Sequence, residues 1–170
     1  MSRRNPFLAL YRTEIATPMN VETRSARARI LIRKPPADVF ASFADADRMG
    51  RFWFTRRDGR LIEGRQSTWY LGSGEDAFSF EVMARTVSEP DRLAIDWTGP
   101  DGKLTTVEWT FEATGEGHTV LSIVESGFAG EDDEVAARVV DSTAGFNQVV
   151  VAAKALIEHG VAINVVDDHV

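Results

Sequence analysis

Carboxylates in the second half of the sequence are the groups best suited to act as general acids or bases. Asp96 and Glu108 each precede a tryptophan, so at the two-residue period of a strand each carboxylate falls on the face opposite the neighbouring ring. If the rings point inward, these carboxylates face solvent and serve no site. Four carboxylates alternate with apolar neighbours in this way and are expected to face solvent: Glu81, Asp96, Glu108 and Glu112.

Glu125 is the exception, because the strand that carries it has an ambiguous inner face. It shares one side of that strand with Leu121 and Ile123. If this side points inward, Glu125 lies on the wall of an interior pocket and could act as a general base. If it points outward, Glu125 is one more solvated carboxylate. The sequence leaves both readings open, and it predicts no other catalytic residue.

Aromatic side chains form a second candidate site, one that binds a ligand. Trp97 follows Leu93 and Ile95 at a period of two, and Trp109 lies between Val107 and Phe111. Large rings can line an apolar pocket, or they can simply fill a core. Phe78 and Phe111 are also expected to face inward. The candidate ligand-binding residues are Trp53, Phe54, Trp69, Phe80, Trp97, Val107, Trp109, Phe146 and Val150.

Other kinds of site find little support in the sequence. The three histidines, His118, His159 and His169, have no partner at metal-ligand spacing, and there is no cysteine. The glycine-rich segment 72–74 lacks the lysine and the following helix of a phosphate-binding loop. We therefore expect neither a metal nor a cofactor.

Composition limits the partners. The 170 residues carry a net charge of −7, which argues against nucleic acid because phosphate binding needs a basic surface. No apolar run approaches membrane-spanning length, and we expect a cytoplasmic protein. The expected partner is a small hydrophobic molecule, and a homodimer is left open.

The elements that must position these residues are short strands followed by one long helix. Strands are expected at 27–34, 61–62, 67–71, 77–88, 93–98, 104–113 and 119–126, with turn residues between them. Short helices are expected at 37–44 and from 45 to about 54. Consecutive strands joined by tight turns favour an antiparallel meander.

The long helix is predicted at 131–159, where apolar residues recur at steps of three and four. Four acids open it and Gly160 follows it as a cap. At 1.5 Å per residue it is roughly 40 Å long, so it needs a broad sheet to lie across. We predict an α+β fold in which a curved antiparallel sheet of six to seven strands wraps around this helix. The expected domain is 21–164, with an N-terminal arm at 1–20 and a tail at 165–170.

Several short motifs, in their order and spacing, resemble the START-like or SRPBCC superfamily, which has the helix-grip fold. They are 30–40 (ILIRKPPADVF), Phe52-Trp53, 89–93 leading to Trp97, 107–111 (VEWTF), Gly127-Phe128 and Gly145-Phe146. That superfamily includes the birch pollen allergen, polyketide cyclases and lipid-transfer domains. Within it, the chain resembles the C-terminal domain of the heat-shock protein 90 ATPase activator and its bacterial homologues, over about residues 22–160. The resemblance implies a pocket between sheet and helix.

These observations favour binding of a small hydrophobic or amphipathic molecule in a cavity between the sheet and the C-terminal helix, reached near 52–54 and the loop 73–76. One alternative is a cyclase- or hydratase-type enzyme that uses an inward carboxylate such as Glu125. Another is a chaperone-interaction module of the ATPase-activator kind. An inward Glu125 beside an open cavity would favour the enzyme, and a filled core with an exposed apolar patch would favour the interaction module.

Overall fold

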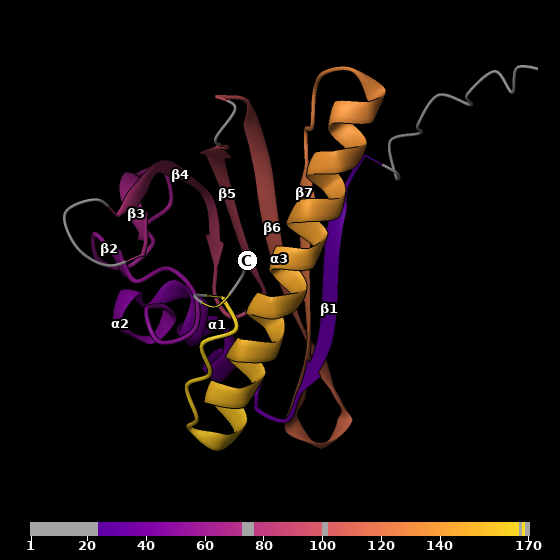
Figure 1. The fold of residues 1–170 in the computed structure, drawn as a ribbon. Helices are drawn as coiled ribbons and strands as arrows, with labels where there is room; N and C mark the ends of the chain where they lie inside the picture. Colours follow the sequence, from indigo (N-terminus) through magenta and orange to yellow (C-terminus); the bar gives the residue numbers. More distant parts are fainter. Residues whose placement is uncertain (1–23, 73–76, 100–101, 167, 169–170) are drawn as a thin grey trace, which may run out of the picture.

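In the computed structural model of the chain, residues 24–72, 77–99, 102–166 and 168 are described. The predicted N-terminal arm 1–20 and the loop 73–76 lie outside these residues. In the described part, one seven-stranded antiparallel sheet has the order β1-β7-β6-β5-β4-β3-β2 (Figure 1). Its strands are β1 (Ala26–Ile32), β2 (Arg56–Arg57), β3 (Gln66–Leu71), β4 (Phe78–Ser88), β5 (Arg92–Thr98), β6 (Leu104–Thr114) and β7 (His118–Ser126). The predicted meander is confirmed from β2 to β7, and β1 is an edge strand that pairs with β7.

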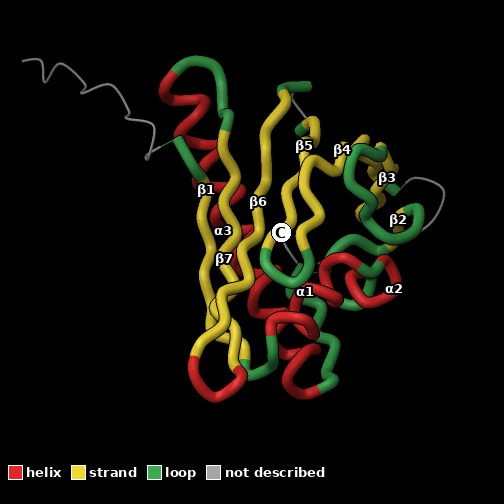
Figure 2. Tube along the Cα trace, turned by 180° about the vertical axis from the view of Figure 1, so that it is seen from behind, coloured by secondary structure: helices red, strands yellow, loops and turns green. Residues whose placement is uncertain are grey.

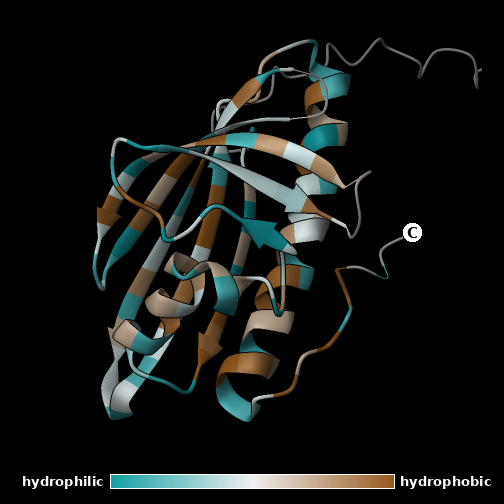
Figure 3. Ribbon diagram, turned by 90° about the vertical axis from the view of Figure 1, so that its left-hand side faces the viewer, coloured by the Kyte–Doolittle hydropathy of each residue, from teal (hydrophilic) through white to brown (hydrophobic). Residues whose placement is uncertain are grey.

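The long helix α3 (Asp132–His159) lies across one face of this sheet and packs mainly along β1 (Figure 1). Seen from behind, the opposite face of β1, β7 and β6 carries none of the described helices (Figure 2). Hydrophilic and hydrophobic residues alternate along the strands, as expected for a sheet with one covered face (Figure 3). The predicted α+β helix-grip architecture is therefore confirmed.

Both ends of α3 agree with the sequence signals. Asp132, Asp133 and Glu134 occupy the first turn, where negative charge suits the helix dipole. Gly160 adopts the left-handed conformation with φ of 69°, and its N–H donates to Leu156 O at 2.8 Å. A side chain at Gly160 would be strained in that conformation, so glycine ends the helix cleanly.

The second of the two short helices ends earlier than the sequence predicts. Helix α1 (Pro36–Ala44) is found as expected, but α2 (Ala46–Met49) ends well before Phe54. The chain leaves the helix there because Phe52, Trp53 and Phe54 all turn into the core. The predicted strand 61–62 is not formed; Leu61 N donates instead to Ala44 O at 3.3 Å. The two-residue strand β2 was not predicted.

Arg57 ties β2 to the end of α1. It is buried, and its guanidinium donates to Phe43 O at 3.0 Å, Gly59 O at 3.1 Å and Ala44 O. The same group lies over the Trp69 ring at 5.3 Å. Burial lowers the pKa of Arg57 to about 10, partly offset by the nearby Asp45 carboxylate, so the side chain stays charged at neutral pH. The buried charge is thus matched by the carbonyls that a helix C-terminus leaves unpaired.

Glu158 fastens the last turn of α3 to the end of β1. Its side chain is 5% exposed, and its Oε1 accepts from Arg33 N at 2.6 Å and from Lys154 Nζ. Lys154 Nζ also donates to Leu31 O at 2.6 Å. Burial alone would raise the pKa of Glu158, but the hydrogen bonds and charges of Lys154 and Arg33 outweigh it and hold the pKa below the ordinary value of 4.5.

This lowered pKa predicts how stability depends on pH. A carboxyl with a lowered folded-state pKa stabilises the fold above its unfolded value, and that contribution disappears as the pH falls through the folded value. Glu158→Gln should therefore lower the free energy of unfolding at neutral pH, and the difference from wild type should shrink as the pH drops below 4.5. Urea unfolding over a pH series measures this. Glu116→Gln, in the exposed turn between β6 and β7, is the control and should change little; a pH-independent difference for Glu158→Gln would contradict the assignment.

Candidate functional site

Two adjoining cavities lie between the sheet and α3. The first, here the Glu125 cavity, has a volume of about 320 Å³, and the second, the Phe146 cavity, about 250 Å³. Trp97, Asp141 and Ser142 line both, so the two hollows meet at the Trp97 ring. The other residues of the Glu125 cavity are Phe80, Gly99, Glu125, Phe128 and Arg138. Those of the Phe146 cavity are Trp53, Leu71, Gly145, Phe146, Gln148, Val149 and Val166.

The amino-terminal half of α3 leaves this space open because its cavity-facing residues are small or polar. Asp141 and Ser142 border both hollows, and Gly145 borders the Phe146 cavity. A Cβ built at Gly145 would meet no atom within 4 Å. Further along the helix, Val149 still lines the Phe146 cavity, whereas Ala152 and Ala153 are fully buried and line neither hollow. The helix therefore leaves space beside its middle turns and packs closely after them.

Aromatic rings form the opposite wall. Trp97 lies near parallel to Phe80, with ring centroids 5.9 Å apart, and to Phe146, with centroids 6.2 Å apart. Trp53 meets Trp97 edge-on at 6.3 Å, and Phe54 does so at 6.1 Å. Rings locked by this many neighbours offer a rigid apolar surface.

Glu125 points into this space, which settles the face of β7. Thr119, Leu121, Ile123 and Glu125 are the buried side of the strand, and Glu125 is 3% exposed. Its Oε1 accepts hydrogen bonds from Trp97 Nε1 at 2.9 Å and from Thr105 Oγ1 at 2.5 Å. Trp97 Nε1 also donates to Thr105 Oγ1 at 2.8 Å. Glu125 Oε2 is buried and has no hydrogen-bond partner among the described residues.

The nine residues suggested for ligand binding separate into two groups. Trp53, Phe80, Trp97 and Phe146 line the cavities. Phe54, Trp69, Val107, Trp109 and Val150 are buried in the close-packed core and line neither. Trp109, for example, packs against Phe43 of α1 at 6.4 Å and against Trp53 at 5.9 Å. An inward-facing strand position therefore meets either the cavity or the short helices, depending on where it lies along the sheet.

Two further expectations need correction. Phe78 was expected inside but is 50% exposed, because it stands at the start of β4 with one ring neighbour, Phe80, at 4.6 Å. Asp96 lies on the outer face, as expected, but it is only 8% exposed. Arg85 Nε at 2.6 Å and Thr106 Oγ1 at 2.7 Å cover its carboxylate.

Sequence reasoning missed several lining residues. Asp141, Ser142 and Gly145 could have been found, since they interrupt the apolar face of the helix at steps of one and three residues. Val166 could not, because it lies after α3 within 165–170, where the sequence predicts a tail. That segment turns back beside α3 (Figure 1), and Ile163, Val165 and Val166 pack on the core.

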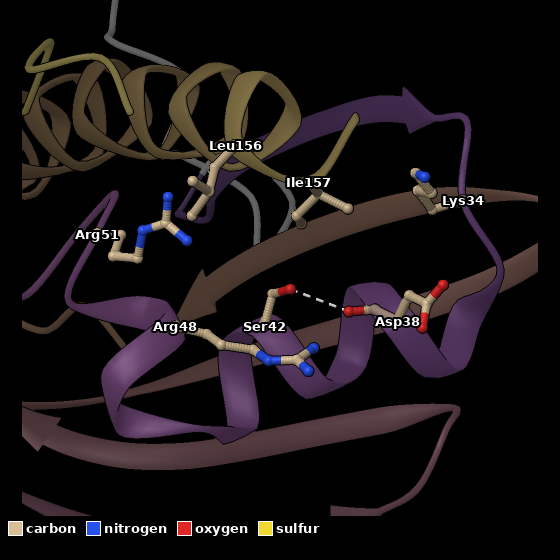
Figure 4. Close-up of a pocket in the computed structure, with 7 residues that line it drawn as sticks. All are labelled: Lys34, Asp38, Ser42, Arg48, Arg51, Leu156 and Ile157. Carbon is tan, nitrogen blue, oxygen red and sulfur yellow. Dashed lines mark hydrogen bonds between the residues drawn. The ribbon is translucent and has the colours of Figure 1, made fainter. Parts of the chain in front are cut away.

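A third hollow, of about 350 Å³, lies between α1, α2 and the last turns of α3. Figure 4 shows Arg48, Arg51 and Lys34 around it, with Ser42 Oγ donating to Asp38 O at 2.9 Å. Leu156 and Ile157 form its apolar side. Its charged groups are largely solvated, and none of its polar atoms is both buried and unpartnered, so it is a weaker candidate than the Glu125 cavity despite its size.

In the described part of the chain, no group of three or more His, Cys, Asp or Glu side chains could hold a metal ion. Among the helices of that same part of the chain, none is long and apolar enough to cross a membrane.

With this geometry in place, comparison with known proteins identifies the family. The sequence profile described as "Activator of Hsp90 ATPase homolog 1-like protein" matches residues 33–158. The chain belongs to this family. No curated protein matches the sequence.

Solved structures support the same fold for this family member. The protein SSP2350 from Staphylococcus saprophyticus has a TM-score of 0.67 at 24% identity, covering 82% of this chain and 95% of that one. DynU16, from the dynemicin biosynthetic locus, has a TM-score of 0.70 at 20% identity, covering 82% of this chain but only 49% of its own. The Aha1 dimer from Colwellia psychrerythraea has a TM-score of 0.63 at 15% identity, covering 80% and 97%. At these identities the likeness is one of fold, the helix-grip fold of the START-like superfamily.

The division between cavity and core predicts the effect of enlarging Val107. This side chain is fully buried, pairs in register with Glu125 and Ile95, and lines neither cavity. Val107→Phe should therefore cost about 1–3 kcal/mol of unfolding free energy by overpacking. Denaturant unfolding measures this, with Leu104→Phe at the exposed start of β6 as the control. A Val107→Phe protein as stable as wild type would mean that Val107 does border open space.

Proposed function

We propose that the protein binds a small hydrophobic or amphipathic molecule in the Glu125 and Phe146 cavities. The observation that carries the proposal is the pair of hollows meeting at Trp97, walled by rings and ending on a buried carboxylate. Ligand pockets typically start at about 300 Å³, so a molecule that reaches past Trp97 would have a pocket of ordinary size.

The lining sets the scale of the affinity. A molecule that buries roughly 200 Å² of apolar surface gains about 5 kcal/mol from the hydrophobic effect. Apolar contact of that size alone corresponds to a dissociation constant of roughly 0.1–1 mM. Tighter binding therefore needs a polar contact as well, and the amphipathic character of the site supplies a place for one.

The comparisons support this reading by analogy only. DynU16 is described as a protein of a biosynthetic locus, which is consistent with a small-molecule role in proteins of this fold. The family name points instead to a chaperone ATPase, and an interaction module of that kind remains the alternative. That alternative would be favoured by a filled interior, and the two cavities weigh against it.

Filling the shared part of the site should test the binding proposal. Ser142 lines both cavities, so Ser142→Leu should occupy the space beside Trp97 and weaken the binding of an apolar probe such as 4-propyltoluene by at least about tenfold. Tryptophan emission and calorimetric titration measure the affinity, with one site per chain expected. Ala144→Leu, on the exposed side of the same helix, is the matched control and should bind as wild type does. If a broad panel of apolar probes leaves the wild-type emission unchanged, the pocket has no such function.

A second function, proton transfer by Glu125 in an enzyme of the cyclase or hydratase type, is favoured by one observation. Glu125 lines the cavity, and its Oε2 atom is buried and accepts no hydrogen bond from another described residue, so it is free to take a proton. If Glu125 removes a proton from a bound carbon acid, the protein should speed hydrogen–deuterium exchange of 2-tetralone in heavy water. Glu125→Gln should then slow that exchange by roughly 100-fold or more. Equal rates for the two proteins, followed by NMR, would exclude this role for the probe used.

A further inference from the structure

The two oxygens of Glu125 have unequal surroundings, and this asymmetry carries information about the ligand. Oε1 is held by two donors, Trp97 Nε1 and Thr105 Oγ1. Oε2 is buried, and within the described part of the chain no donor reaches it. A buried carboxylate oxygen without a donor is costly, and native proteins keep few of them. A ligand that supplies the missing donor would remove this cost, whereas a purely apolar ligand would not.

We propose that Glu125 Oε2 accepts a hydrogen bond from a hydroxyl group of the ligand, so that the ligand class is a phenol or alcohol on an apolar, ring-sized body. This inference rests on the proposed binding function and names the chemistry that the site selects. The ring body lies against Phe80, Trp97 and Phe128, and its hydroxyl points to the foot of the Glu125 cavity.

The donors Trp97, Thr105 and Arg138 already have other partners. The single N–H of the Trp97 indole is shared between Glu125 Oε1 and Thr105 Oγ1, and the single O–H of Thr105 donates to Glu125 Oε1. The Arg138 guanidinium lies 5.1 Å over the Phe128 ring, and its Nη1 is 3.5 Å from Ala129 O. None of these donates to Oε2. The Trp97 and Thr105 bonds also fix the carboxylate plane, so Oε2 is presented in one direction.

The number of donors distinguishes a hydroxyl from an amine. A hydroxyl has one hydrogen to donate, which matches the one unpartnered oxygen. An ammonium has three, and Oε2 could accept only one of them; the other two would need Asp141 or Ser142, which line the same cavity. The oxygen is therefore assigned to a hydroxyl, whose single hydrogen it satisfies in full.

A pair of ligands of the same shape tests the assignment in the wild-type protein. In 4-propylphenol and 4-propyltoluene a hydroxyl replaces a methyl group, so apolar burial is nearly equal and only one can donate. The phenol should bind at least about tenfold more tightly, as expected when a buried oxygen without a partner gains a donor. Calorimetric titration measures the ratio, and 4-propylbenzylamine supplies the ammonium arm, which should bind more weakly than the phenol.

Glu125→Gln should then remove most of the preference. Because Trp97 and Thr105 both need an acceptor, the amide oxygen takes the place of Oε1 and the NH₂ group takes that of Oε2. The acceptor that recognised the hydroxyl becomes a donor, and the phenol–toluene ratio should fall below about threefold. Binding of 4-propyltoluene checks that the cavity is still formed. Glu108→Gln, on the outer face of β6, is the matched control and should keep the wild-type ratio.

The outcomes separate this inference from the proposed function. Equal wild-type affinities for the phenol and the toluene would overturn the hydroxyl assignment and leave cavity binding in place. Binding of neither compound would remove both proposals. If 4-propylbenzylamine binds more tightly than the phenol, the choice of a hydroxyl is overturned. If the Glu125→Gln protein keeps the wild-type phenol–toluene ratio, a group other than Glu125 recognises the hydroxyl. If that variant does not fold, the wild-type ratio decides alone.

Discussion

The structure depends on one geometric constraint, which is that a single helix cannot cover a seven-stranded curved sheet. Helix α3 packs along β1, where its buried valines and alanines allow close approach, and Glu158 fastens its last turn there. The strands on the other side, β3 to β5, must be covered by something else. Rings from the segment after α2 and from the strands themselves supply that cover, and the space they leave beside α3 is the pair of cavities.

Two buried ionisable side chains, Arg57 and Glu125, differ in how fully their polar atoms are hydrogen-bonded. Arg57 reaches three backbone carbonyls and an aromatic ring, and so its charge is matched where it lies. Glu125 is matched at one oxygen and left open at the other. A buried group whose polar atoms all have hydrogen-bond partners holds elements together. A group on a cavity wall that keeps one polar atom without a partner can still accept a hydrogen bond from a ligand.

Membership of the family and likeness to solved structures establish the architecture but leave the chemistry to the residues of the site. The helix-grip fold serves as a frame for many functions, and function follows from what lines the hollow. In this chain the lining combines Trp97, Phe80 and Phe128 with one carboxylate and with the small or polar positions of α3. Under the proposed function, that combination favours a ligand with an apolar body and a polar head over a purely apolar lipid tail.

The sequence by itself determined the periodic elements, because each repeats a local pattern: alternation in the strands, steps of three and four in α3, and the glycine that ends it. It also narrowed the reactive candidates to Glu125, without deciding which way that residue points. Only the tertiary structure decided this, since β7 lies between β1 and β6 and α3 covers one of its faces. It likewise decided that Val107 and Trp109 belong to the core while Trp97 borders the cavity, and that Val166 reaches the site. These facts depend on which distant segment lies opposite a residue, and a local pattern carries no record of that.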